Sequence, residues 1–151
     1  MTEPKAHENL TLRRIYDAPP ERVFRAWTDP AELARWNVPA DGWTIEVLEV
    51  DLRVGGHYRA TFGPPGEEPY LETDEYREIV RPKRLVFTET ISRGGTVLTQ
   101  TLCTVEFIDL GGRTEVVLTD EGIGADVHRG GWSRALDNLA RIVAGSRATS
   151  T

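Results

Sequence analysis

Short apolar or alternating runs, separated by turn residues, occupy the chain from about residue 43 to residue 121. The turn residues are Gly55-Gly56, Gly63-Pro64-Pro65-Gly66, Arg81-Pro82-Lys83, Gly94-Gly95 and Gly111-Gly112. Connections this short predict antiparallel neighbours, because a parallel pair needs a crossover of about a dozen residues or more. In the runs 97–107 and 114–121 apolar and polar positions alternate, which predicts a sheet covered on one face and solvated on the other.

One strand and two short helices are predicted ahead of that region. Residues 9–16 are typical of a strand. Pro19-Pro20 starts a helix, because proline is tolerated at the first helical position, and Asp29 with Glu32 three residues later starts a second one. The apolar stripes of the two helices comprise Val23, Phe24, Trp27, Leu33 and Trp36.

A long amphipathic helix is predicted from about Ala125 to Ala144, with Gly145 just past its end. Its stripe recurs at spacings of four, four, three and four residues and comprises His128, Trp132, Leu136, Leu139 and Val143. Roughly 20 residues at a rise of about 1.5 Å give a length of about 30 Å. A helix of that length lies across a sheet of six or seven strands.

These elements predict an α+β fold: a twisted antiparallel sheet of six or seven strands wrapped around a long C-terminal helix, with two short helices after the first strand. We expect a single domain over residues 9–145, an N-terminal tail over residues 1–8 and a C-terminal tail over residues 146–151.

Composition limits the possible partners and environment. The chain has 151 residues, enough for one domain with a sizeable core, and its 18 basic and 24 acidic residues leave a net charge of −6. That charge opposes binding to nucleic acids and anionic membranes. A single cysteine, Cys103, excludes a disulfide framework, and no apolar run approaches the ~20 residues that span a bilayer. Because the first residues also lack a signal-peptide pattern, we expect a cytoplasmic protein with no nucleic-acid or membrane partner.

A set of residues in a definite order and spacing extends over nearly the whole chain. It comprises Arg14, Asp17-Ala18-Pro19, Val23-Phe24, Ala26-Trp27-Thr28-Asp29-Pro30, Leu33, Trp36, Pro39, Asp51-Leu52-Arg53, Gly55-Gly56, Tyr76, Glu78, Pro82, Arg84-Leu85, Glu121-Gly122, Gly131-Trp132, Leu136 and Leu139. With this set the chain resembles the homologues of the activator of the 90-kDa heat-shock protein ATPase, within the START-like (birch-allergen-like) helix-grip superfamily. Asn37 stands where that family usually carries a second tryptophan after the one matching Trp36, which affects any ligand preference based on a tryptophan pair.

The resemblance implies the helix-grip fold and leaves the function open, since the superfamily includes ligand carriers, cyclases, hydroxylase domains and co-chaperone modules. A twisted sheet that grips one helix often leaves a space between them. We expect an apolar cavity there, although the same side chains can instead fill the core completely. The candidate ligand-binding residues are Trp36, Tyr76, Phe87, Phe107, His128, Trp132 and Leu136.

Two enzyme motifs are incomplete, and no residue spacing indicates a metal site. The segment 122–127 lacks the third glycine of a dinucleotide-binding loop and is interpreted as a strand-to-helix turn, and the segment 131–135 ends in alanine where a nucleophile elbow needs glycine. The imidazole and thiol groups available to a metal belong to His7, His57, His128 and Cys103. None of these residues is closely spaced with another, so we expect no metal site and no cofactor.

Two charged residues fall on apolar faces. His128 either presents its imidazole to the mouth of the cavity or is a partly solvated residue bonded to a loop carbonyl. Arg14 shares a strand face with Leu10 and Tyr16, so either it pairs with a buried carboxylate or that face is the exposed one, because an isolated buried guanidinium is too costly. We therefore expect a structural ion pair between Arg14 and Asp120 in preference to an anion-binding role.

The acidic residues at 67–68 and 72–75 are interpreted as solvated faces and not as paired catalytic carboxylates.

Three functional hypotheses follow. The first is a domain that binds a small apolar or amphipathic molecule. The second is an enzyme that uses the cavity for acid–base chemistry through His128, Tyr76 and either Asp120 or Glu78. The third is a regulatory module that interacts with a chaperone. Both a monomer and a homodimer paired through an edge strand fit the pattern.

Overall fold

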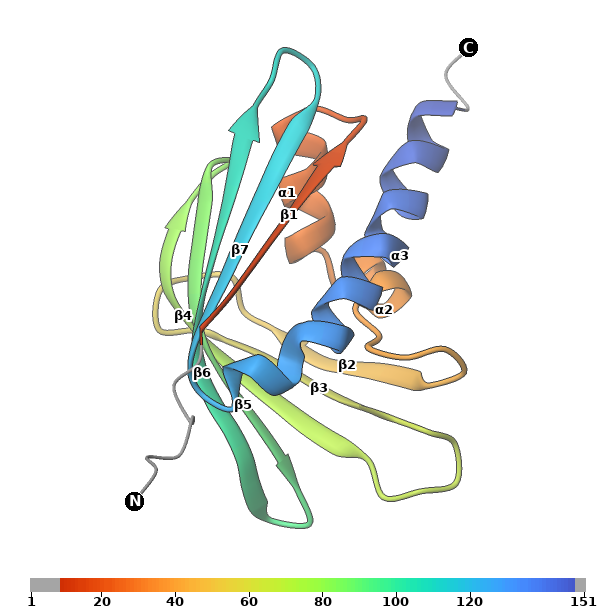
Figure 1. Ribbon diagram of the computed structural model, residues 1–151, viewed down its shortest axis with the longest axis vertical. Helices are drawn as coiled ribbons and strands as arrows, with labels where there is room; N and C mark the ends of the chain where they lie inside the picture. Colours follow the sequence, from red (N-terminus) through yellow and green to blue (C-terminus); the bar gives the residue numbers. More distant parts are fainter. Residues whose placement is uncertain (1–8, 149–151) are drawn as a thin grey trace, which may run out of the picture.

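The computed structural model describes residues 9–148 (Figure 1). In chain order the elements are β1 (Leu10–Tyr16), α1 (Pro20–Thr28), α2 (Pro30–Trp36), β2 (Thr44–Val50), β3 (His57–Gly63), β4 (Tyr70–Val80), β5 (Arg84–Arg93), β6 (Thr96–Asp109), β7 (Thr114–Ile123), the 3₁₀ turn η1 (Ala125–His128) and α3 (Arg129–Ala148). All five predicted turn segments lie between consecutive strands. The predicted tail 1–8, and residues 149–151 of the predicted tail 146–151, lie outside the described residues.

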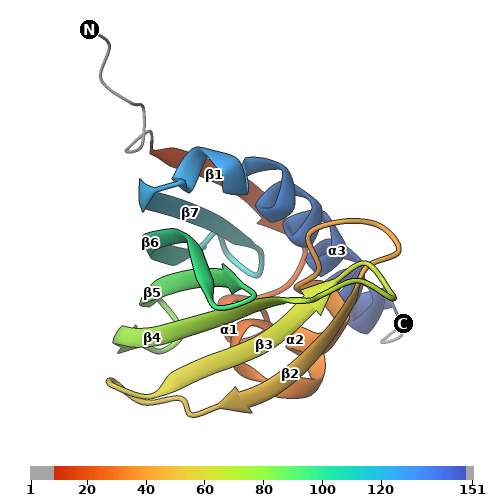
Figure 2. The same ribbon diagram turned by 90° about the horizontal axis from the view of Figure 1, so that it is seen from below.

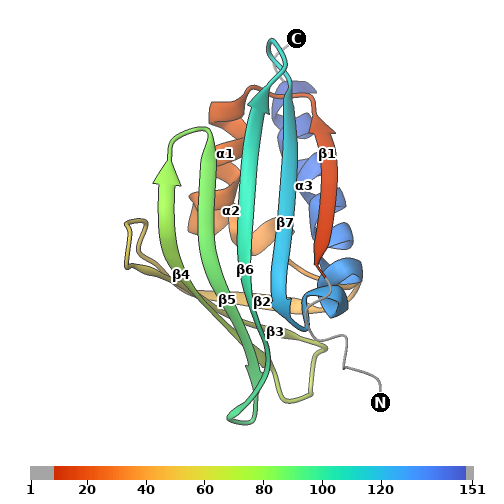
Figure 3. The same ribbon diagram turned by 60° about the vertical axis from the view of Figure 1, so that its left-hand side comes forward.

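The strands form one seven-stranded antiparallel sheet in the order β1-β7-β6-β5-β4-β3-β2. From β2 to β7 each strand pairs with its sequence neighbour, as the short turns require. β1 pairs with the last strand, with Leu10 opposite Asp120 and Tyr16 opposite Thr114. The sheet curves around α3, and all three α-helices lie on its concave side (Figures 2 and 3). This arrangement confirms the predicted helix-grip fold.

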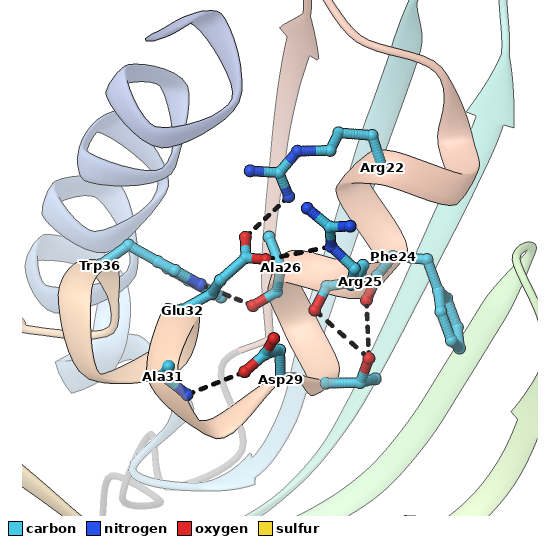
Figure 4. Close-up of polar contacts among 9 residues, drawn as sticks. Arg22, Phe24, Arg25, Ala26, Asp29, Ala31, Glu32 and Trp36 are labelled. Atoms are coloured by element: carbon cyan, nitrogen blue, oxygen red, sulfur yellow. Dashed lines mark hydrogen bonds and ion pairs between the residues drawn. The ribbon is translucent and has the colours of Figure 1, made fainter. Parts of the chain in front are cut away.

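The corner between α1 and α2 is fixed by side-chain hydrogen bonds (Figure 4). The Asp29 carboxylate accepts a hydrogen bond of 2.9 Å from the backbone N–H two residues later and caps α2, as the sequence predicts. The fully buried Trp36 donates its indole N–H to the carbonyl of Ala26 at 2.8 Å. Glu32 of α2 pairs with Arg22 of α1 at 2.7 Å. These bonds hold the two helices as one unit against the sheet.

The long helix α3 buries its predicted apolar stripe against the sheet. The buried residues of the stripe are Trp132, Ala135, Leu136, Leu139 and Val143, each at most 7% exposed. Two details differ from prediction: the first turn is the 3₁₀ turn η1, and the helix continues to Ala148. The expected end at Gly145 is therefore wrong, because one glycine lowers helix stability by only about 1 kcal/mol and does not break the helix. No described helix is both long and apolar enough to cross a membrane.

Gly124 makes the turn from β7 into η1. Its φ of 85° lies in the left-handed region, and a Cβ atom there would lie 2.5 Å from Cγ2 of Thr99. The segment 122–127, which runs from the last residues of β7 through Gly124 into η1, is thus a strand-to-helix turn, as predicted. It places His128 at the edge of the concave face.

Candidate functional site

A cavity of about 390 Å³ lies between the first turns of α3 and the concave face of the sheet. Trp43, from the loop between α2 and β2, closes one side of it, and this loop reaches toward α3 (Figure 2). Phe62 and Tyr70, from the ends of β3 and β4, form the adjacent wall. Ile91 and Leu98, from the β5–β6 hairpin, line the cavity farther along the sheet.

Three stacked rings make one wall apolar. The ring centroids of Trp43 and Tyr70 are 5.8 Å apart and those of Phe62 and Tyr70 are 5.4 Å apart, with interplanar angles of 14° and 22°. We name Trp43, Phe62 and Tyr70 the aromatic wall. Trp132 lines the cavity from α3. Flat apolar surfaces of this kind suit the body of a small hydrophobic molecule.

Acidic side chains form the polar end of the cavity. Glu72 and Glu89 line it, and Asp74 lies directly opposite Glu89 in the pairing of β4 with β5. One carboxylate oxygen from each of the three residues lies within 4.8 Å of the others, and all three residues are at most 6% exposed. We name Glu72, Asp74 and Glu89 the carboxylate cluster. Like charges directly opposite on one face of a sheet repel each other.

This arrangement corrects the expectation that residues 72–75 are solvated. Glu72 and Asp74 share the concave face with Tyr76, because alternate residues of a strand point to the same side. Burial raises the pKa of each carboxyl of the cluster well above its ordinary value, and the neighbouring carboxylates raise it further. The cluster therefore takes up protons far more readily than exposed acids do.

His128 joins the cavity to a second buried carboxylate. Its Nδ1 lies 2.6 Å from Asp120 and 3.3 Å from Glu89, and its Nε2 lies 2.9 Å from the Thr99 hydroxyl. Asp120 is fully buried and also accepts the indole N–H of Trp132 at 3.2 Å. Burial alone lowers the pKa of His128, but the hydrogen bond to Asp120 and the charges of Glu89 and Asp120 outweigh it and raise the pKa above 6.5. The imidazole therefore bonds to carboxylates, where the alternative interpretation expected a loop carbonyl.

The predicted ligand-binding residues fall into three groups. His128 and Trp132 line the cavity. Trp36, Tyr76 and Phe87 line a deeper space of about 20 Å³, which also borders Glu72 and Asp74. Phe107 and Leu136 belong to the hydrophobic core.

Arg14 does not pair with Asp120, which corrects that expectation. Its guanidinium lies 3.3 Å from Asp137 and 2.9 Å from the Ser133 hydroxyl, both on α3. Asp120 lies opposite Leu10, which precedes Arg14 by four residues on β1. Because a strand rises about 3.3 Å per residue, the backbone positions of Arg14 and Asp120 are about 13 Å apart along the sheet.

Glu78 also lies away from the cavity. It pairs with Arg84 at 3.2 Å and its side chain is 47% exposed, because a register shift after Tyr76 turns it out of the concave face. Glu78 therefore cannot act on a molecule bound in the cavity.

Sequence reasoning missed the carboxylate cluster and the aromatic wall. A signal for the first was present: once Tyr76 and Phe87 are placed on the inner face, a period of two places Asp74 and Glu89 there as well. No comparable signal exists for Trp43, which lies in a loop and whose position depends on how that loop meets α3.

Comparisons with known proteins are consistent with this architecture. The family model described as Activator of Hsp90 ATPase homolog 1-like protein matches residues 17–144. A crystal structure of a protein from Chromobacterium violaceum is 31% identical, with a TM-score of 0.81 over 89% of this chain and 96% of that one. A protein from Rhizobium loti is also 31% identical, with a TM-score of 0.78 over 89% and 95% of the two chains. No functionally curated protein matches the chain.

Proposed function

The chain belongs to the family described as Activator of Hsp90 ATPase homolog 1-like proteins, and from that premise we propose that it binds a small apolar or amphipathic molecule between α3 and the sheet. The observation that carries the proposal is the cavity of about 390 Å³, which has an aromatic wall on one side and buried polar groups at its end. A hollow lined mainly by apolar side chains with a few convergent polar groups is the usual form of a small-molecule site.

The available surface supports useful affinity. A ligand that buries about 300 Å² of apolar surface gains roughly 7 kcal/mol at about 25 cal/mol per Å², before the costs of association. Part of that gain is lost to the entropy of binding, so micromolar dissociation constants are expected.

A matched pair of variants tests the proposal. Ile91→Trp places a large ring in the cavity, whereas Ile108→Trp makes the same change at a residue that is 40% exposed and outside the cavity lining. We expect the uncharged fluorophore prodan to bind the wild type and Ile108→Trp with a blue-shifted emission, and to bind Ile91→Trp at least tenfold more weakly. Equal binding to all three proteins, or binding to none, would refute the proposal.

Trp132→Leu provides the opposite perturbation. It removes an indole from the cavity lining and enlarges the hollow, so the affinity for prodan should change. Val143→Ala truncates another buried residue of the same helix, away from the cavity, and should lower the melting temperature without changing prodan affinity. Parallel shifts of affinity in both variants would indicate a general loss of packing.

Acid–base catalysis in the same cavity is a second candidate, and one observation favours it. His128 lines the cavity and lies within hydrogen-bond reach of Asp120, with Glu89 at 3.3 Å. An imidazole oriented by a carboxylate is a common proton-transfer device.

Deuterium exchange tests the second candidate. If His128 moves protons to and from a bound carbonyl compound, the protein accelerates wash-in of deuterium at the carbon next to the carbonyl of 1-indanone. His128→Gln should abolish the acceleration, and His57→Gln, at an exposed position on β3, should retain it. An unaccelerated rate with the wild-type protein argues against catalysis by this dyad.

A further inference from the structure

The carboxylate cluster has three carboxyl groups and, among the described residues, an ion pair with one basic side chain, His128. The cavity lining contains acidic Glu72 and Glu89 and, within the part of the chain that the structure describes, no lysine or arginine. The His128 imidazole lies 3.3 Å from Glu89 but is also engaged by Asp120 at 2.6 Å. Buried charges are ordinarily paired or neutralised, and one imidazole shared with Asp120 does not balance the cluster when more than one of its carboxyl groups is ionised.

One acceptor of the cluster has no hydrogen-bond donor among residues 9–148. Oδ1 of Asp74 is fully buried and has no hydrogen-bond partner among the described residues. The side chains that form hydrogen bonds with the Glu72 carboxyl are those of Glu89 and Asp74, which are carboxyl groups themselves. An unpaired buried acceptor is destabilising, and a suitable donor recovers the loss. An ammonium group carries three N–H donors and one positive charge, and no acceptor.

The apolar part of the cavity suits the rest of such a molecule. The aromatic wall stands beside Glu72, since Tyr70 is two residues before it on β4 and Phe62 lies opposite Tyr70 on β3. The Arg93 guanidinium already lies over the Tyr70 ring, 4.6 Å from its centroid, so the wall is assigned the apolar body of the ligand and not its charge. A metal ion would use the carboxylates but would have no use for stacked rings or for a hollow of about 390 Å³.

We propose that the ligand is a cationic amphiphile, an aliphatic or arylalkyl amine whose ammonium group pairs with Glu72 and Glu89 and whose apolar body lies against Trp43, Phe62 and Tyr70. The inference rests on the proposed ligand-binding function and adds the chemical class of the ligand. Glu72 and Glu89 determine the preference for a cation, and the aromatic wall determines the preference for an apolar body.

A pair of probes that differ in one group tests the charge. Isothermal titration calorimetry at pH 8 compares 4-phenylbutylamine with 4-phenylbutan-1-ol, which has the same apolar body and no charge. Charge-assisted hydrogen bonds contribute about 1.5–3 kcal/mol, so the amine should bind about tenfold or more tightly than the alcohol. Glu72→Gln and Glu89→Gln should each remove most of this advantage and leave the affinity for the alcohol nearly unchanged.

Glu75→Gln is the matched control. Glu75 lies between Asp74 and Tyr76 on β4 but points to the opposite face, where its side chain is 42% exposed. This variant changes the net charge as Glu72→Gln does and should keep the full preference for the amine.

The alternative outcomes are distinct. If the alcohol binds as tightly as the amine, the cavity binds apolar molecules but the preference for a cation is refuted. If Mn²⁺ or Ca²⁺ binds with micromolar affinity, displaces the amine and is lost in Asp74→Asn, the cluster is a metal site and the inference is overturned. If the amine, the alcohol and prodan all fail to bind, both the inference and the proposed function fall.

Discussion

Glu72→Gln should stabilise the protein, and the gain should grow as the pH rises. Glutamine has nearly the shape of glutamic acid but cannot ionise, so it resembles the protonated form of Glu72. The substitution therefore removes the charge of one member of the carboxylate cluster while keeping the packing of β4 against β5.

The size of the effect follows from the geometry. Two charges within 4.8 Å of each other repel by about 3.5 kcal/mol at an effective dielectric constant of about 20. Protonating Glu72 at pH 8 costs about 5 kcal/mol relative to an ordinary glutamic acid, which sets an upper limit on the penalty that the substitution can relieve. We expect a gain of up to about 3 kcal/mol at pH 8, which for a domain of this length raises the melting temperature by roughly 6–12 °C.

The sign follows from linkage. The pKa of Glu72 is raised in the folded state, so the folded protein binds the proton more tightly than the unfolded chain does. Its stabilising contribution is fully present below the ordinary pKa of about 4.3 and is lost as the pH rises through the folded-state pKa. The difference between Glu72→Gln and the wild type should accordingly vanish near pH 4.

Urea denaturation at pH 4.5 and pH 8, followed by tryptophan fluorescence, measures this difference. Glu75→Gln, on the solvated face of the same strand, is the control and should change stability by less than about 0.5 kcal/mol at either pH. Equal effects of Glu72→Gln at the two pH values, or a loss of stability at pH 8, would refute the account of a strained acidic cluster.

Two further predictions concern α3 and its first turn. A Cβ at Gly131 would lie 2.9 Å from Cβ of Pro39, whereas a Cβ at Gly130 meets nothing within 4 Å. Gly130→Ala should therefore gain about 0.5–1 kcal/mol in urea denaturation, and Gly131→Ala should gain less or lose stability because the loop beside the cavity must move. Asp120→Asn should lower the pKa of His128, seen by NMR titration of the imidazole, because it removes the hydrogen bond and charge that raise it. Asp120→Asn should also lower the free energy of unfolding at pH 6 by about 1.5–3 kcal/mol, and this effect should fade as the pH rises and the imidazole loses its proton. An unchanged imidazole pKa would contradict the hydrogen bond between His128 and Asp120.

The fold was predictable because its signals are local. Each hairpin is marked by turn residues between alternating runs, and the stripe of α3 follows from spacing alone. The end of α3 was misplaced at Gly145, since helix length also depends on contacts that a single glycine does not override.

The site was less predictable because it depends on contacts between distant segments. Arg14 pairs with Asp137, 123 residues away, and that partner is chosen by where α3 lies on the sheet. Asp120 was matched to the wrong cation, since strand parity fixes a face but not a position along it. The burial of Asp74 opposite Glu89 depends on the register of β4 with β5, which is not visible when each strand is interpreted alone.

The aromatic wall has an evolutionary consequence. Trp43, Phe62 and Tyr70 lie in a loop and at strand ends, outside the cluster of buried residues that joins α3 to the sheet. Under the proposed function, substitutions there should alter what the cavity accepts with less effect on folding than changes at Leu136 or Leu139, which belong to the core. If these proteins bind ligands as proposed, lineages that share this scaffold can diverge in ligand preference one peripheral residue at a time while the helix-grip framework remains intact.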